Sequence, residues 1–293
     1  MSKISEELFI NDFQRKFKKN GLSSEVIDLF QKIIYKFYKT HQRKFPFREK
    51  ITPYNVLVSE IMLQQTQTGR VSEKFINFTK KFRDFFSLSL ASVEEVLKEW
   101  KGLGYNRRAI ALKKIAEIVI NEYNGKLPDS IDELKKLPQI GVNTASSIIA
   151  FAFNKPTTFI ETNIRRVYIY FFFAYEKRVK DKEILPIIQK TIDNNNPRKW
   201  YYAIMDYGTM LKKTHPELRT RSAHYRKQAP FKGSIRQIRG KLLEILIKEG
   251  PTEISKIQQI LKVYNDDRFI IILDQLKKEG FIDINENLIT FAK

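Results

Sequence analysis

The chain has 293 residues, of which 53 are lysine or arginine and 33 are aspartate or glutamate, so its formal net charge is +20. This length can hold one large domain or two modest ones, each with its own core. The chain has no cysteine, which excludes disulfides, thiolate zinc sites, thiol catalysis and cysteine-ligated iron–sulfur clusters. The charge predicts nucleic acid as the partner, although a lysine-rich proteome would give the same surplus.

The sequence predicts neither a membrane segment nor a metal site. No apolar run is long enough to span a bilayer, and the opening MSKISEELF does not read as a signal peptide. The three histidines, His41, His215 and His224, are scattered along the chain. We therefore expect a soluble, cytoplasmic protein without a metal cofactor.

The first half of the chain reads as a succession of amphipathic helices. Apolar residues recur at helical spacing, and Ser23, Thr52–Pro53 and Ser92 mark helix starts. The segment 43–48 is predicted to break the second helix. The predicted helices are Ile4–Lys18, Ser23–Lys39, Thr52–Gln67, Arg70–Phe82, Ser92–Trp100, Arg107–Tyr123 and Ser130–Leu137.

The third of these helices carries a single carboxylate, Glu60, among apolar neighbours. Desolvation would raise its pKa, and a raised pKa suits a general acid near neutral pH. The alternative is a glutamate on the solvent-exposed face of the helix.

A glycine-rich segment, KGLGYNRRA, follows at residues 101–109. Its glycines allow close backbone approach, and Tyr105 could stack on bases or wedge between them. The alternative is a loop whose tyrosine packs on the nearest helix.

The sequence LPQIG predicts a tight hairpin between two helices. Pro138 ends the first helix, Gly141 is expected to permit a turn that a Cβ would strain, and Asn143 and Thr144 are expected to cap a helix over Asn143–Phe153. Such a turn presents N–H groups and a positive helix end, the geometry that holds a phosphate.

Glu161 opens the next predicted helix, which carries Arg165 and Arg166. A carboxylate at a helix start, just beyond a phosphate-binding turn, is where we place the chemistry. The alternative for Glu161 is a helix cap without a chemical role.

The remainder is predicted to contain further helices and a small terminal module. The predicted helices are Thr162–Tyr175, Asp181–Asn194, Pro197–Lys213, Arg236–Lys248, Ile254–Lys262 and Asp266–Glu279, and the predicted strands are Phe281–Ile284 and Leu288–Phe291. Three helices and a two-stranded wing over residues 233–293 resemble a winged helix-turn-helix. Its third helix is not especially basic, so DNA reading is no more favoured than a packing or partner role. A basic segment precedes the module and either binds DNA or is a solvated linker; it contains Lys212, Lys213, Arg219, Arg221, Arg226 and Lys227.

Three motifs in residues 44–208 together resemble the helix-hairpin-helix DNA glycosylases, the superfamily of endonuclease III and the MutY-type adenine glycosylases. SEIMLQQTQ nearly duplicates the MutY-type catalytic helix, and GLGYNRRA resembles Gly-Leu-Gly-Tyr-Tyr-x-Arg-Ala. LPQIGVNTA fits Leu-Pro-Gly-(Val/Ile)-Gly-x-x-Thr-Ala except at Gln139. The resemblance implies a mainly α fold: a helical glycosylase domain over residues 1–229, with a six-helix barrel at about 52–159 and a cap from both flanks. A winged-helix domain over residues 230–293 would follow it.

The same resemblance assigns roles to five residues around a flipped base. Glu60 would protonate the adenine leaving group, and Glu161, at the place of the family aspartate, would face it and stabilise the sugar cation. Asn163 matches the asparagine next to that carboxylate. Arg48, in Pro-Phe-Arg where MutY-type enzymes have Pro-Trp-Arg, would contact the base, and Asp206 would line its pocket.

The resemblance also implies DNA contacts and the absence of a lyase step. Asn143 stands where endonuclease III has the lysine that forms a Schiff base, so a monofunctional glycosylase is expected. The hairpin is expected to bind a monovalent cation through backbone carbonyls, and no iron–sulfur cluster is expected. The residues expected to contact DNA are Gln65, Thr66, Tyr105, Gln139, Gly141, Asn143, Thr144 and Arg165.

The expected function is hydrolysis of the N-glycosidic bond of a flipped base. The base would be adenine opposite G or 8-oxoguanine in double-stranded DNA, and the protein would act as a monomer. One alternative is a uracil or thymine mismatch glycosylase of the same fold. The other is a DNA-binding protein without catalytic activity.

Overall fold

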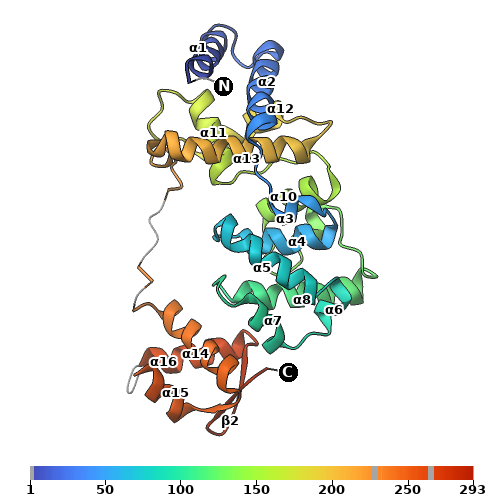
Figure 1. Ribbon diagram of the computed structural model, residues 1–293, viewed down its shortest axis with the longest axis vertical. Coiled ribbons are helices and arrows are strands. Elements are labelled where there is room, and N and C mark those ends of the chain that lie inside the picture. The colour runs from blue at the N-terminus through green and yellow to red at the C-terminus, as the bar shows by residue number, and fades with distance from the viewer. Residues whose placement is uncertain (1–2, 226–229, 232, 263–266, 293) are drawn as a thin grey trace. The chain divides into compact units, whose positions relative to one another are not determined.

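The computed structural model describes residues 3–225, 230–231, 233–262 and 267–292, and it is mainly helical, as predicted (Figure 1). Two compact units make up the chain. The first contains Met1–Pro53, Asp129–Lys135 and Ile140–Lys227, and the second contains Tyr54–Pro128, Lys136–Gln139 and Gln228–Lys293. Within the described residues, no helix is long and apolar enough to cross a membrane.

The first unit is built around a cluster of aromatic side chains. Phe30 packs against Phe171 and Trp200, with ring centroids 5.0 and 5.6 Å apart. These contacts place Phe30, on the second predicted helix, in the core of the first unit. The helices of this unit are α1 (Lys3–Asn20), α2 (Ser24–His41), α3 (Pro46–Glu49), α9 (Ile131–Leu134), α10 (Val142–Phe153), α11 (Thr162–Phe172), α12 (Asp181–Thr191) and α13 (Pro197–Thr214), and the 3₁₀ helix η1 (Pro216–Arg219) follows them.

Helices α11 and α13 lie side by side (Figure 1) and approach most closely at a glycine. A Cβ on Gly208 would lie 2.3 Å from the carbonyl oxygen of Asn163 and 2.8 Å from the Cβ of Asn163. The absence of a side chain at Gly208 is therefore what lets α13 reach the first turn of α11.

The second unit is built around a helix that is buried on nearly every side. In α4 (Pro53–Leu63), all residues from Tyr54 to Ser59 are buried, as are Ile61 and Met62. A helix with apolar side chains all round belongs inside a helical core. The helices around it are α5 (Thr68–Lys81), α6 (Phe85–Ser89), α7 (Val93–Trp100) and α8 (Arg107–Glu122).

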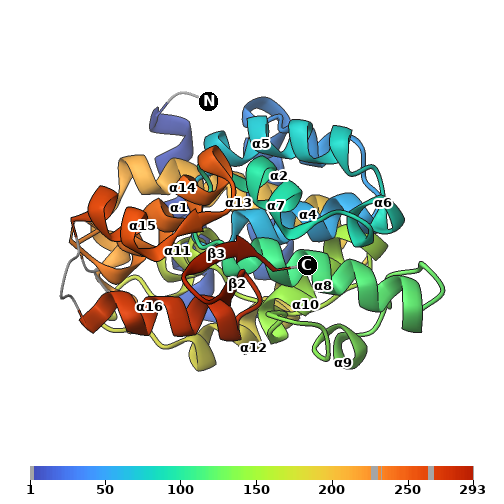
Figure 2. The same ribbon diagram turned by 90° about the horizontal axis from the view of Figure 1, so that it is seen from below.

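The C-terminal part of the second unit is a winged helix, as predicted. Its elements are α14 (Ile235–Glu249), β1 (Thr252–Glu253), α15 (Ile254–Leu261), α16 (Asp267–Lys278), β2 (Ile282–Asn285) and β3 (Leu288–Phe291). The strands form an antiparallel sheet in the order β1-β3-β2, beside α16 (Figure 2). Strand β1 was not predicted, and Asp266, the predicted start of the third helix, lies outside the described residues.

Several predicted helices end earlier than expected, among them those over Ser130–Leu137, Thr162–Tyr175 and Asp181–Asn194, which end at Leu134, Phe172 and Thr191. The helix predicted over Thr52–Gln67 ends at Leu63, and Gln65 has a left-handed backbone with φ of 54°. The segment 43–48 follows the end of α2 at His41, as predicted, but it also contains the start of α3, because Pro46 occupies the first helical turn, where a proline is tolerated. The short helix α6 was also missed; its start is fixed by a capping box between Asp84 and Ser87.

We expect Gly208→Ala to lower the free energy of unfolding by about 2–3 kcal/mol, because the added methyl group would overlap the backbone of Asn163. The matched control is Gly240→Ala in α14, where an added Cβ meets nothing within 4 Å. That change should raise the free energy of unfolding by about 0.5–1 kcal/mol. Urea denaturation of both variants measures the difference, and equal effects would contradict the packing argument.

Candidate active site

The predicted site residues fall into two groups, one in each unit. The first unit holds Arg48, Gly141, Asn143, Thr144, Glu161, Asn163, Arg165 and Asp206, and the second unit holds Glu60, Gln65, Thr66, Tyr105 and Gln139. The structure brings residues together within each group. The expected juxtaposition of Glu60 and Glu161 stays a prediction.

Glu161 caps the N-terminus of α11. Its Oε1 atom accepts hydrogen bonds from the backbone N–H groups of Asn163 and Ile164, both at 2.8 Å. Its Oε2 atom accepts a 3.2 Å hydrogen bond from Nδ2 of Asn163. Burial raises the pKa of Glu161, against the opposing effects of these backbone hydrogen bonds and of Arg165 and Arg166. The charge of the Glu161 carboxylate is therefore poorly solvated by water.

Arg166 links this cap to α13 and was not among the predicted site residues. Its Nη1 atom donates to Oδ1 of Asn163 and to the carbonyl oxygen of Gly208, both at 2.9 Å. Burial lowers the pKa of Arg166, while the nearby charge of Glu161 opposes that shift. The predicted pair Glu161 and Asn163 is thus fixed by a buried cation. Nothing in the local sequence distinguished Arg166 from the neighbouring Arg165.

Arg48 and Asp206, predicted to line a base pocket, form an ion pair. Nη1 of Arg48 lies 3.1 Å from each carboxylate oxygen of Asp206, whose side chain is fully buried. Arg43 donates its backbone N–H at 2.8 Å and its Nε at 2.7 Å to the same carboxylate. The Arg48 guanidinium also lies 4.4 Å from the ring centroid of Tyr202. Arg48 is therefore held in place, with Asp206 as its anchor.

Arg165, predicted to bind DNA, forms a two-pronged ion pair with Asp181. Its Nε and Nη2 atoms lie 2.6 and 2.7 Å from the two carboxylate oxygens. This pairing offsets the charge of Arg165, so a role in phosphate binding would require Asp181 to share the guanidinium. The predicted DNA contact of Arg165 stays a prediction.

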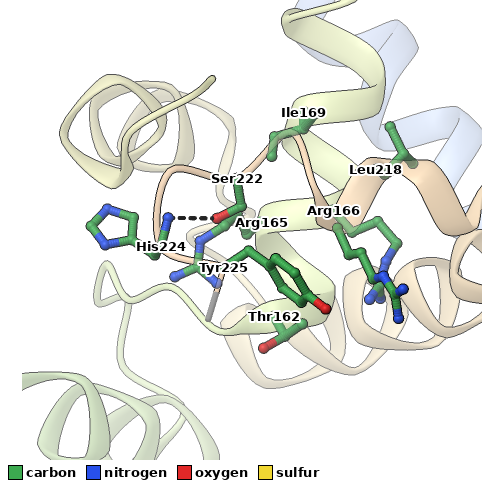
Figure 3. Close-up of a pocket in the computed structure, with 9 residues that line it drawn as sticks. Thr162, Arg165, Arg166, Ile169, Leu218, Ser222, His224 and Tyr225 are labelled. Atoms are coloured by element: carbon green, nitrogen blue, oxygen red, sulfur yellow. Dashed lines mark hydrogen bonds between the residues drawn. The ribbon is translucent and has the colours of Figure 1, made fainter. Parts of the chain in front are cut away.

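A pocket of ≈ 300 Å³ is lined in part by Thr162, the residue that follows Glu161 in the sequence. Its lining residues are Thr162, Arg165, Arg166, Ile169, Leu218, Arg219, Ser222, His224 and Tyr225. In the view of Figure 3, the guanidinium groups of Arg165 and Arg166 lie on opposite sides of the Tyr225 ring. The Arg219 guanidinium lies 5.4 Å from the same ring. The pocket therefore combines cationic groups with an aromatic surface.

In the basic segment after α13, one arginine forms hydrogen bonds with the backbone of an earlier part of the chain. Arg221 donates its Nε to the carbonyl oxygen of Glu176 at 3.0 Å and its Nη2 to the carbonyl oxygen of Phe173. Arg221 thereby ties the segment to the end of α11. Arg226 and Lys227 lie outside the described residues.

In the second unit, Glu60 is the only charged residue of α4 and is half-buried. Its exposure is intermediate, so the role of Glu60 as a general acid and the alternative of a glutamate on the solvent-exposed face both stay open. Its neighbours Ser59, Ile61 and Met62 are buried, so Glu60 lies beside the buried part of α4, near the C-terminal end of that helix.

Arg108, not predicted as a site residue, joins that end of α4 to the glycine-rich loop. Its Nη1 atom donates to the carbonyl oxygens of Ile61, Met62 and Gln64 at 2.9, 2.8 and 2.5 Å. Its Nη2 atom donates to Oγ1 of Thr66 and to the carbonyl oxygen of Gly104, both at 3.0 Å. Burial lowers the pKa of Arg108 to about 10. The guanidinium therefore stays charged at neutral pH and satisfies carbonyl groups that a helix end leaves unpaired.

Tyr105 lies at the end of the glycine-rich loop with an unusual backbone conformation. Its φ is 48°, and those of Gly102 and Gly104 are 95° and 71°. A left-handed tyrosine is uncommon, and such strain persists only where the surrounding structure enforces it. Its side chain remains 39% exposed, so the ring is presented to solvent, as a DNA wedge requires.

The hairpin differs from its predicted geometry at three residues. Gln139, where the family has glycine, is the left-handed residue, with φ of 58°. Gly141 has φ of −87° and open space around its Cα, so it does not relieve strain. Gly141 is also the N-cap of α10, so Asn143 and Thr144 lie within the first turn of that helix and not, as was predicted, at its start. Oδ1 of Asn143 instead accepts a 3.4 Å hydrogen bond from the backbone N–H of Ile160.

We expect Arg108→Lys to lower the free energy of unfolding by about 2–4 kcal/mol, because one ammonium group cannot reach both the α4 carbonyls and the glycine-rich loop. Urea denaturation measures the loss. The control is Arg70→Lys, at an exposed position of α5, which should cost less than about 0.5 kcal/mol. Equal small effects would show that Arg108 is dispensable.

We expect Glu161→Gln to become more stable than the natural protein as the pH rises. Because burial raises the pKa of Glu161, the stabilising contribution of its protonated form is present below the ordinary glutamate pKa and is lost as the pH rises through the raised pKa. Thermal unfolding at pH 4 and pH 8 should give similar midpoints at the lower pH and a higher midpoint for the variant at the higher pH. The exposed Glu176→Gln controls for the change in net charge, and a pH-independent difference would contradict the argument.

The chain is similar to several known proteins. The family model of the HhH-GPD superfamily of base excision DNA repair proteins matches residues 58–192. An adenine DNA glycosylase from Buchnera aphidicola subsp. Baizongia pistaciae is 34% identical over 186 residues, which cover 62% of this chain and 52% of the relative. A thymine/uracil-DNA glycosylase from Methanothermobacter thermautotrophicus is 28% identical over 186 residues, covering 62% of this chain and 84% of the relative. The chain spans about half the length of the first of these relatives.

A solved structure has the same fold. The structure of a thermostable thymine-DNA glycosylase matches with a TM-score of 0.56 and 26% sequence identity, over 63% of this chain and 86% of that one. The family match covers the end of α4, the glycine-rich loop, the hairpin and Glu161. Residues 58–192 therefore match the HhH-GPD superfamily, and the chain has the fold of a known DNA glycosylase.

Proposed function

We propose that the protein is a monofunctional DNA glycosylase that removes adenine mispaired with G or 8-oxoguanine from double-stranded DNA. The observation that carries the proposal is the place of Glu60. It is the only charge on a helix enclosed by apolar residues, and that helix ends in the Gln64–Thr66 turn fastened by Arg108. The name of the Buchnera relative, an adenine DNA glycosylase, supports the same substrate.

In the proposed reaction, the base leaves the DNA stack before any bond breaks, because neither carboxyl could reach it inside a duplex. Tyr105 fills the space that the base vacates. Glu60 donates a proton to the departing adenine, so the leaving group is neutral. Water adds to the sugar cation and releases a proton, which balances the proton that Glu60 gave to adenine, and the hydrolysis is complete.

Glu161 would stabilise the positive charge that develops on the sugar as the bond breaks. Its carboxylate is deprived of water, so an adjacent cation would relieve the cost of its charge. Asn163 and Arg166 hold that carboxyl in a fixed orientation. The longer side chain of glutamate, compared with the family aspartate, is accommodated here by the helix cap that it forms.

The proposal includes no lyase step. Asn143 stands at the position of the endonuclease III lysine, and an amide cannot form a Schiff base. We also retain two predictions: a monovalent cation at the hairpin carbonyls, and a monomer as the active form.

A second candidate function is removal of uracil or thymine from mismatches with G. It is favoured by the Methanothermobacter relative, which is named a thymine/uracil-DNA glycosylase and is matched over 84% of its length. The two candidates share the fold and both carboxyls. They differ only in the base that is released.

Single-turnover assays on four duplexes test the proposal: A opposite G, A opposite 8-oxoguanine, U opposite G and T opposite G, with alkali cleavage to reveal abasic sites. We expect adenine release by the natural protein. Glu60→Gln should slow release by about 10²–10⁴-fold, and Glu161→Gln by about 10²–10³-fold. The control is Glu94→Gln, which removes an exposed carboxylate paired with Lys98 and should leave the rate unchanged.

The outcomes separate the candidates. Release of uracil or thymine alone would replace the proposed substrate by the second candidate. Tight DNA binding without release of any base would make the protein a DNA-binding protein without catalytic activity. Cleavage of the strand without alkali would overturn the assignment of Asn143.

A further inference from the structure

The winged-helix module is joined to the rest of the second unit by one carboxylate that two arginines share. Glu279, directly after α16, accepts hydrogen bonds from Nε and Nη2 of Arg107 at 2.8 and 2.5 Å. It also accepts from Nη2 of Arg239, in α14, at 2.6 Å. Burial tends to raise the pKa of Glu279, but the hydrogen bonds from Arg107 and Arg239 hold that pKa below its ordinary value. Arg107 is the first residue of α8, so this cluster fixes the module to the start of that helix.

Two further contacts reach the segment that precedes α8. Nζ of Lys101 lies 2.7 Å from Oε1 of Glu244 in α14. Nη1 of Arg236, also in α14, lies 3.5 Å from the hydroxyl oxygen of Tyr105. The module therefore contacts both ends of residues 101–107, here called the Tyr105 loop, and also the tyrosine within it.

The Tyr105 loop needs such support. Gly102 and Gly104 adopt positive φ angles without strain, but Tyr105 has a φ of 48°, and a strained backbone of this kind persists only where its surroundings enforce it. Arg108 supports the loop from the interior through the carbonyl of Gly104. The module supports it from the other side.

The exposed face of α16 does not suit DNA reading. A recognition helix that enters the major groove carries polar and basic side chains toward the bases. In α16, however, Ile270 and Ile271 are 68% and 50% exposed, and Asp274 pairs with Lys278. Glu279, at the end of that helix, is already engaged with Arg107. The contacts of the module thus point inward, to the Tyr105 loop.

We propose that the winged-helix module positions the Tyr105 loop for insertion into DNA, with Glu279 as the positioning residue. The predicted effect on base release rests on the proposed function. The contact between the module and the Tyr105 loop does not depend on that function. A wedge held in place before it meets DNA loses less conformational freedom on insertion. The module would therefore speed base flipping without reading any sequence.

The test is hydrogen exchange of the Tyr105 loop amides in the free full-length protein, together with single-turnover base release from the A opposite G duplex. Glu279→Gln should raise exchange in the loop and slow base release, each by about tenfold, since a charged hydrogen-bond cluster is lost. Affinity for a fully paired duplex, which does not require flipping, should stay the same. The matched control is Asp274→Asn, which removes a carboxylate of the same module that forms an ion pair with Lys278 in α16.

A second variant, Arg107→Gln, breaks the cluster from the α8 side and leaves the Arg239–Glu279 pair within the module. If Glu279→Gln raises exchange throughout the module, that variant has loosened the module itself. Arg107→Gln then tests whether the contact positions the Tyr105 loop. Unchanged loop exchange and an unchanged rate in Arg107→Gln would overturn the inference. If the natural protein releases no base, the proposed function fails, whereas faster loop exchange in the variants would still support the positioning contact.

Discussion

The second unit depends on a buried guanidinium, that of Arg108. The C-terminal end of a helix exposes carbonyl groups without partners and carries a partial negative charge. The Nη1 atom of Arg108 donates to carbonyl groups at the end of α4, and its positive charge lies next to the partial negative charge there. Its Nη2 atom donates to the carbonyl oxygen of Gly104. A single side chain therefore fixes the helix that carries Glu60 and the loop that carries Tyr105. Moving either one would leave buried carbonyl groups unpaired, at a cost of about 1–3 kcal/mol each.

In the first unit, a different buried arginine, Arg166, holds two helices together. Arg166 bridges Asn163 and the carbonyl oxygen of Gly208, and the missing side chain of Gly208 allows that approach. The result is a carboxyl, Glu161, fixed at a helix start and poorly hydrated. Each unit thus presents one carboxyl, positioned by a cation that does not itself take part in the proposed chemistry.

Helices and their buried faces could be predicted from the sequence, because periodicity and caps are local signals. The wing and the aromatic core around Phe30 followed from the same signals. The left-handed residue of the hairpin could not be assigned, because Gln139 rather than a glycine adopts that conformation. The end of α4 could not be placed either, since it depends on Arg108, which is distant in sequence. Motifs identified Arg48 and Asp206 separately, but only tertiary structure shows them as an ion pair.

The central claim is that both carboxyls act on one flipped adenine, and a structure of the protein bound to DNA tests it most directly. The duplex would carry 2′-fluoro-2′-deoxyadenosine opposite 8-oxoguanine, because the fluorine disfavours the sugar cation and blocks bond cleavage. The account predicts the adenine outside the helix with Glu60 at its edge, Glu161 beside the sugar and Tyr105 inserted in the duplex. An adenine still stacked in the duplex, or flipped with Glu60 distant from it, would contradict the account.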